Sequence, residues 1–136
     1  MLFKMENCVF CKIVKKDILA EIVYEDDKII AFLDIKPVNP GHTLIIPKEH
    51  HKMMGETPDE IISDMFVKAK KIMRTIRKVT GADYVAVSVV GLDVPHFHIH
   101  LVPRYLNDGL ANFWPSKTYK ENEAGKIAQK IRSFLK

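Results

Sequence analysis

The sequence has few of the residues that mark repetitive or disordered proteins: its 136 residues include only 2 cysteines, 6 glycines and 7 prolines. These numbers exclude a collagen-like repeat and a low-complexity segment, and 47% hydrophobic residues argue against a disordered chain. A chain of this length buries roughly two-thirds of its unfolded surface and needs no crosslinks to fold. We therefore expect one domain spanning residues 1–136.

Long hydrophobic runs are also missing. Apolar stretches such as 44–46 and 85–90 are far shorter than the roughly 20 residues of a membrane span. Residues 1–6 have neither the apolar core nor the cleavage site of a secretory signal. With only two cysteines besides, the sequence suggests a reduced, cytoplasmic protein without a membrane partner.

A strong charge of one sign is absent too, since the formal net charge is only +4. Many basic residues lie between Lys68 and Lys78, and we interpret them as the solvated face of a helix. A nucleic-acid surface is the alternative. The chain has no ladder of aromatic and basic residues, so no nucleic-acid partner is expected.

The hydrophobic periodicity that is present predicts an α+β fold with an antiparallel five-stranded sheet, one long helix and a C-terminal helix. A short first helix is expected with Asn7 as its cap. The expected strands are 21–24, 29–33, 42–46, 84–90 and 96–102, and the expected short and C-terminal helices are 7–15 and 121–135.

The long helix has clear start and stop signals. Thr57 can cap it, Pro58 suits its first position, Glu60 completes a capping box, and Gly81 can end it in a left-handed turn. One apolar stripe at helical spacing is predicted to face the core: Ile61, Ile62, Met65, Phe66, Ala69, Ile72, Met73, Ile76 and Val79. The C-terminal helix has a similar face formed by Ile127, Ile131, Phe134 and Leu135.

The most informative stretch is 95–102, with the sequence Pro-His-Phe-His-Ile-His-Leu-Val. Side chains alternate faces on a strand, so His96, His98 and His100 share one face. Such a face could be an ordinary polar strand face or a three-histidine metal site, although three residues in a line converge poorly on one ion. It could also carry nucleophilic catalysis on phosphorus, because a neutral imidazole is a fair nucleophile and a good leaving group.

The spacing His-x-His-x-His followed by two apolar residues resembles the signature of the histidine triad (HIT) family of nucleotidyl hydrolases and transferases. The similarity is to the bacterial-type, zinc-containing branch and covers roughly residues 7–119. Its other parts are Cys8-x-x-Cys11, the turn 24–27, the segment 32–37, Gly41-His42 through Pro47 to His50, and Pro103-Arg104-Tyr105.

The resemblance implies a role for each histidine near the triad. His98 matches the nucleophile that attacks the α-phosphorus and forms a covalent nucleotidyl-imidazole. His100 matches the residue that contacts the phosphate and helps to protonate the leaving group. His96 completes the triad, and His42 matches a fourth histidine beside it.

The resemblance also implies a nucleotide site. Asp34 matches the carboxylate that binds the ribose hydroxyls, and Phe32, Leu33 and Ile35 match positions that form the base pocket. Backbone amides around 91–94 would hold phosphate oxygens. Trp114, in an irregular stretch, is expected to close over the leaving group.

Cys8 and Cys11, one helical turn apart, face the same way. In the bacterial-type branch such a pair is joined by a histidine after the third strand and by the first triad histidine, which His50 and His96 match. The resemblance thus implies a structural Zn²⁺ site of the Cys2His2 type beside the catalytic strand. Two buried, reduced thiols are the alternative.

Two departures from the family pattern concern the phosphate loop. Residues 91–95 form a shorter loop than many members have, and Asp93 stands where a hydroxyl residue is usual. A carboxylate there would repel phosphate unless it turned away or took a proton. Val89, with Ser88 beside it, replaces an asparagine that is common on the preceding strand.

We therefore expect a homodimeric nucleotidyl hydrolase that cleaves purine-nucleoside phosphoramidates or dinucleoside polyphosphates at the α-phosphorus and releases a nucleoside monophosphate. The dimer would pair the long helices and extend the sheet. The alternative is a nucleotide- and zinc-binding module with little or no turnover.

Overall fold

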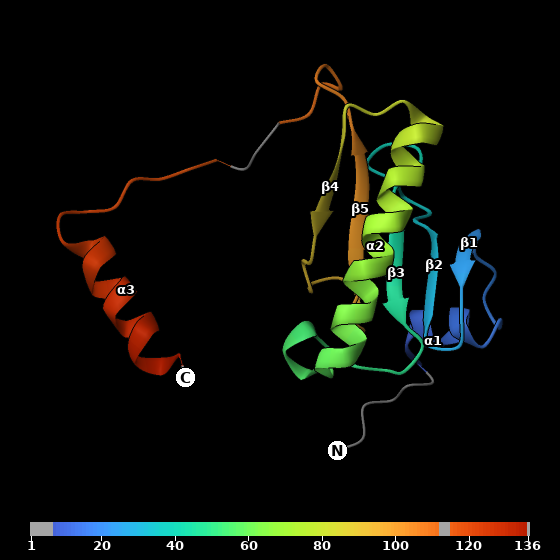
Figure 1. Cartoon of the computed structure of the whole chain (residues 1–136), viewed down its shortest axis with the longest axis horizontal. Coiled ribbons are helices and arrows are strands. Elements are labelled where there is room, and N and C mark those ends of the chain that lie inside the picture. The colour runs from blue at the N-terminus through green and yellow to red at the C-terminus, as the bar shows by residue number, and fades with distance from the viewer. Residues whose placement is uncertain (1–6, 112–114, 136) are drawn as a thin grey trace.

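The structure is a computed structural model that describes residues 7–111 and 115–135. Its sheet has the strand order β1-β2-β3-β5-β4, with every neighbouring pair antiparallel. The predicted α+β architecture is thereby confirmed (Figure 1). The elements are α1 (Val9–Val14), β1 (Ile22–Glu25), β2 (Ile29–Leu33), β3 (Thr43–Pro47), η2 (Met54–Glu56), α2 (Asp59–Thr80), β4 (Tyr84–Ser88), β5 (Ile99–Arg104) and α3 (Glu123–Phe134).

Helices cover the two faces of the sheet, α2 one face and α1 the other (Figure 1). Because side chains alternate along a strand, β2 sends Ile29 and Ala31 toward α2 and Ile30 and Phe32 toward α1. This explains why β2 and β3 are almost wholly apolar, as strands between two layers must be. The central strands are therefore buried on both faces, and the histidine-bearing segment lies directly beside β3.

The long helix ends as predicted but begins differently. Gly81 takes a φ of 72° and closes α2 in a left-handed turn, which confirms the stop signal. The capping box is wrong: Pro58 is the N-cap and makes no side-chain cap hydrogen bond. The Thr57 hydroxyl instead donates to the carbonyl oxygen of Met53 (2.9 Å), because the preceding η2 turn offers a nearer partner.

The apolar stripe of α2 is confirmed in its centre. Met65, Ala69, Ile72 and Ile76 are buried, and Ile61, Ile62 and Met73 pack against them. Phe66 and Val79 are exposed at the margins of the stripe, at 37% and 79%. The periodicity therefore located the buried face but overestimated its width.

Strand and helix ends differ from the predictions where loops leave the sheet. Strand β4 ends at Ser88 and β5 begins at Ile99, so the connection is longer than the predicted turn 91–95 and includes His96 and His98. Helix α1 begins at Val9, and the Cys8 thiol, not Asn7, accepts the capping bond from the Cys11 amide. The other ends differ from the predictions by two residues at most, the usual uncertainty for helix and strand termini.

The C-terminal helix stands apart from the sheet and from α2 (Figure 1). Its predicted apolar face is real but exposed in the single chain, with Ile127 at 41%, Ile131 at 58% and Phe134 at 86%. Trp114, proposed to cover the leaving group, lies outside the described residues. Among the described residues, no helix is long and apolar enough to cross a membrane.

Candidate active site and metal centre

The triad segment is held between β3 and β4 at the edge of the buried core. Leu101 and Phe97 point toward α2 and are buried there. The Phe97 amide donates to the carbonyl oxygen of His51 at 2.6 Å, which ties the segment to the chain after β3. The triad histidines occupy the alternate positions, and His96 and His98 are only 0% and 4% exposed. The alternation expected from the sequence therefore extends beyond the regular strand.

The backbone determines which nitrogen of His98 carries the proton. Its Nδ1 lies 2.7 Å from the carbonyl oxygen of His96. A carbonyl oxygen can only accept, so Nδ1–H donates and Nε2 keeps a free lone pair. The ring of Phe10 packs edge-on against His98, with the centroids 5.1 Å apart, and also against Phe32 at 5.5 Å. The orientation of His98 is thus fixed by a backbone hydrogen bond and an aromatic contact, and Nε2 takes no part in that hydrogen bond.

His42 and His100 form a second oriented pair. The Val38 amide donates to Nδ1 of His42 (3.1 Å), so the proton of neutral His42 is on Nε2. That Nε2 lies 3.0 Å from Nδ1 of His100 and donates to it. His100 must then carry its own proton on Nε2, an atom that is buried and has no hydrogen-bond partner among the described residues. The pair therefore presents an N–H donor that a bound molecule can use.

Burial disfavours the protonated form of this pair. Desolvation lowers the pKa of His42 and of His100 below the ordinary value, since a buried imidazolium is costly. Repulsion from His98 and His42, when these rings are protonated, lowers the pKa of His100 further. Asp34, whose Oδ2 lies 3.7 Å from Nε2 of His42, opposes both shifts. The protonated form of this pair is consequently a stronger acid than free imidazole.

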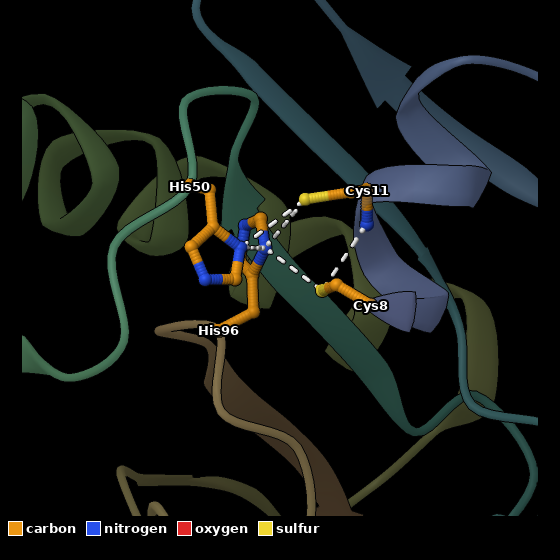
Figure 2. Close-up of side chains that lie close together, drawn as sticks. All are labelled: Cys8, Cys11, His50 and His96. Atoms are coloured by element: carbon orange, nitrogen blue, oxygen red, sulfur yellow. Dashed lines mark hydrogen bonds between the residues drawn. The ribbon is translucent and has the colours of Figure 1, made fainter. Parts of the chain in front are cut away.

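A separate cluster joins three segments that are distant in the sequence. Cys8 and Cys11 come from the start of α1, His50 follows β3, and His96 precedes β5 (Figure 2). One donor atom from each of these four residues lies within 4.8 Å of all the others. Nδ1 of His96 is 3.4 Å from the Cys8 sulfur and 3.6 Å from the Cys11 sulfur, and Nδ1 of His50 is 3.2 Å from the Cys11 sulfur.

The protonation of His96 suits a metal ligand. Its Nε2 lies 2.8 Å from the carbonyl oxygen of Pro47 and must donate to it, so Nδ1 faces the thiols without a proton. Burial lowers the pKa of His96 to about 4, which keeps the ring neutral. Burial and the neighbouring Cys8 raise the pKa of the Cys11 thiol to about 11. Two sulfurs and two imidazole nitrogens are the donor set of structural zinc sites, and these residues fit that ion.

The predicted nucleotide-binding residues are only partly brought together. Phe32 is buried on the histidine side of β2, and Asp34 lies against His42. Leu33 instead lines a cavity of about 410 Å³ on the α2 side, because successive strand residues point to opposite faces. Ile35 is 87% exposed in the loop after β2 and touches neither cluster in the described contacts.

The residues predicted to lie on the phosphate side of the site are found at the end of β4 and in the connection that follows it. Ser88 pairs with His100 across the β4–β5 ladder. Val89 lines a cavity of about 260 Å³ whose wall also includes His96 and His98. Asp93 is exposed, and its charge acts on His100.

Phe10 is a site residue that the sequence analysis missed. Besides His98, its ring packs edge-on against His96 (5.8 Å), so one aromatic side chain supports both histidine clusters. Its position between the two cysteines gave no clear signal, because Val9, the other residue between them, is exposed.

Comparison with known proteins agrees with the geometry. A family model for the HIT domain matches residues 15–107. An uncharacterized HIT-like protein from Methanocaldococcus jannaschii is 42% identical, covering 75% of this chain and 82% of the relative. Protein hit from Bacillus subtilis is 38% identical (96% and 92%). A protein from Schizosaccharomyces pombe named adenosine 5′-monophosphoramidase is 35% identical (96% and 99%).

Solved structures show the same fold. The crystal structure of a HIT family member from Bacillus subtilis superposes with a TM-score of 0.85 at 37% identity, covering 96% of this chain and 98% of that one. A zinc-bound histidine triad protein from Mycobacterium smegmatis reaches 0.74 at 32% identity (94% and 98%). With the family model matching most of the chain, the protein belongs to the HIT family.

Proposed function

We propose that the protein is a nucleotidyl hydrolase that cleaves purine-nucleoside phosphoramidates at the α-phosphorus and releases a nucleoside monophosphate. The observation that carries this proposal is the orientation of His98, whose Nδ1–H is held by the carbonyl of His96 and whose Nε2 keeps its lone pair. Relatives named adenosine 5′-monophosphoramidase, which are 31–35% identical to this chain, support the hydrolase proposal at the family level.

In the first step, Nε2 of His98 bonds to the α-phosphorus as the bond from phosphorus to the leaving nitrogen breaks. The leaving nitrogen takes a proton from the protonated His42–His100 pair through Nε2 of His100. In the second step, water attacks phosphorus and gives its proton back to this pair, and the bond to His98 breaks. Both histidine groups return to their starting protonation.

The nucleotide would occupy the side of the sheet covered by α1. Phe10 and Phe32 supply an apolar wall next to His98. Asp34 has one oxygen occupied by the Lys36 amide (2.9 Å), which orients the carboxylate for a ribose hydroxyl. Ser88 and Val89, at the end of β4, would flank the phosphate.

The Cys8, Cys11, His50 and His96 cluster is proposed to hold a structural Zn²⁺ ion. The metal would crosslink α1, the segment after β3 and the triad segment when bound. The carbonyl oxygen of His96 also accepts the hydrogen bond from Nδ1–H of His98. His96 would therefore link the metal cluster to the orientation of the proposed nucleophile. The zinc-bound relative from Mycobacterium smegmatis supports this assignment.

We further propose a single domain over residues 1–136 and a homodimer formed along β4. This strand is an edge of the sheet, and Val87 on it is 43% exposed. Val89 and Val90, which directly follow the strand, are 39% and 54% exposed. An exposed apolar edge strand favours pairing with a second copy.

A second candidate is a nucleotide- and zinc-binding module with little turnover. Asp93 in the β4–β5 connection favours it, because a carboxylate in a loop that receives phosphate would oppose binding of an anion. A second substrate class, dinucleoside polyphosphates, has the same chemistry at phosphorus but an anionic leaving group. Relative rates on the two classes decide between them.

The test is to trap the intermediate. A slow adenosine phosphoramidate is mixed with the protein, quenched in milliseconds, and the protein is digested for mass spectrometry. We expect an adenylyl group on His98, no turnover by His98→Ala with an unchanged circular dichroism spectrum, and normal turnover by the control His51→Ala. An adduct on another side chain, or product without any adduct, would contradict the mechanism.

A further inference from the structure

The neutral His42–His100 pair can carry its protons in two arrangements. Nε2 of His42 and Nδ1 of His100 lie 3.0 Å apart, so one proton lies between them. If His42 holds that proton, His100 carries its own on Nε2 and offers an N–H donor. If His100 holds it, Nε2 of His100 is a bare lone pair and His42 is protonated on Nδ1. Only the first arrangement offers a bound substrate an N–H group.

The backbone of the loop between β2 and β3 selects the first arrangement. The Val38 amide donates to Nδ1 of His42 at 3.1 Å, and a nitrogen that accepts this bond cannot carry a proton itself. The His42 amide donates to the carbonyl oxygen of Asn39 at 3.0 Å, which closes a turn over residues 38–42. The side chain of Val38 is half-exposed, so its own packing holds the amide only weakly. The proton on His42 therefore depends on what else holds this turn in place.

The side chain of Asn39 ties this turn to the end of β5. Its Nδ2 donates to the carbonyl oxygen of Pro103 at 2.9 Å and to Oδ2 of Asp108 at 3.2 Å. Among the described residues, these are the only hydrogen bonds that join residues 35–41 to a segment distant in the sequence. Since β5 also carries His100, the turn that orients His42 is fixed to the strand that holds its partner.

Asp108, the acceptor for Asn39, is itself held in place. The side chains of Asp108 and Arg104 are only 5% and 11% exposed. The carboxylate accepts from Nε of Arg104 at 2.7 Å, from the Tyr105 amide at 3.1 Å and from the Leu110 amide at 3.0 Å. The hydrogen bond from Arg104 holds the pKa of this carboxyl well below its usual range, so Asp108 stays an acceptor. Asn39 is thus bonded to a buried, ionised and oriented group.

We infer that Asn39 is a positioning residue: by tying the 38–42 turn to β5, it keeps the proton of His42 on Nε2 and leaves the N–H of His100 available to the substrate. Asn39 acts through Val38 and His42, without contact to the reacting atoms. If its side chain is removed, the Val38 amide is no longer confined to Nδ1 of His42, and the pair can reverse. The effect on catalysis rests on the proposed hydrolase function, whereas the protonation of the pair does not.

Nuclear magnetic resonance of the ring nitrogens tests this directly. Proton–nitrogen correlation spectra of protein with isotope-labelled histidine show which nitrogen of each ring is protonated, with signals assigned through His42→Gln and His100→Gln. In the parent we expect Nε2–H on both rings, and Nδ1–H on His42 would overturn the inference without any variant. In Asn39→Ala, and in the isosteric Asn39→Leu, we expect both rings to shift toward Nδ1–H. His98, held by the His96 carbonyl, should keep its Nδ1–H and serves as the internal control.

Turnover of an adenosine phosphoramidate separates this inference from the proposed function. We expect kcat of Asn39→Ala to fall about tenfold, with a smaller change in KM, because a donor is misplaced. The control Asn107→Ala removes the same side chain from an exposed position beside Asp108 and should match the parent. Protons that shift in a protein without turnover support the role of Asn39 and contradict only the hydrolase. Unchanged protons on His42 and His100 in the Asn39 variants overturn the inference even if kcat falls.

Discussion

Two histidine clusters share one short segment of this chain and differ in what their nitrogens meet. In the Cys/His cluster, both nitrogens of His96 are committed, one to the Pro47 carbonyl and one to the two thiols, and the ring is fully buried. The second cluster, which consists of His42, His98 and His100, is the proposed catalytic cluster. In it, His98 and His42 each have one nitrogen held by a backbone group, and the other nitrogen faces another histidine or the proposed site.

The difference shows that backbone partners, not residue type, separate the proposed metal ligand from the proposed nucleophile. His96 and His98 are two positions apart and point to the same side of the sheet. A carbonyl accepts from Nε2 of His96 but from Nδ1 of His98, so opposite nitrogens keep their lone pairs. The first lone pair points to two sulfurs, and the second remains available for phosphorus.

Breaking the Cys/His cluster is expected to have the largest effect. Cys11→Ser removes one sulfur from a buried four-residue set, and we expect the melting temperature to fall by about 10 °C or more. Scanning calorimetry with and without a chelator measures this. The chelator should lower the melting temperature of the parent and of the control Lys12→Ser, but not that of Cys11→Ser. A parent that contains no zinc and ignores the chelator would contradict the assignment.

Gly41→Ala should disturb the catalytic cluster and spare the metal cluster. Gly41 immediately precedes His42 and has a φ of 100°. A Cβ added to it would lie 2.9 Å from Cγ2 of Thr80. We expect a loss of about 1–3 kcal/mol in the free energy of unfolding and a lower kcat, with unchanged zinc content. The control Gly55→Ala meets no atom within 4 Å. Urea denaturation that gave equal stability for both variants would contradict the role of Gly41.

Several features of the site could be predicted from the sequence. Strand alternation is enough to put the three triad histidines on one side, because the apolar side chains of Phe97, Ile99 and Leu101 are buried in the core on the opposite side. The roles of His42 and His50 could come only from the family resemblance, because residues separated by more than 40 positions from the triad have no periodicity in common with it.

Other features depend on tertiary contacts that no local pattern encodes. The protonation of each ring follows from single backbone atoms of Val38, Pro47 and His96. The capping box at Thr57 failed because the Met53 carbonyl competed for its hydroxyl. The helical period predicted the apolar face of α3 but could not show that this face stays exposed within one chain.

The smallest expected effect concerns the pH dependence of stability. Burial lowers the pKa of His42 and His100 in the folded protein, so the unfolded chain binds more protons as the pH falls below about 6.5. Stability from these groups is therefore complete above that pH and decreases toward acid, by at most about 1.4 kcal/mol per pH unit for each proton. Asp34 raises both pKa values and limits this loss.

Asp34→Asn sharpens the contrast between the clusters, because it removes that charge while keeping every histidine. We expect the metal-loaded variant to lose more stability than the parent between pH 7 and pH 5, since its two histidines resist protonation further in the folded state. Urea denaturation at each pH measures the difference, with Asp27→Asn as the control for net charge. Parallel stability curves for Asp34→Asn and the parent would show that Asp34 does not act on the His42–His100 pair.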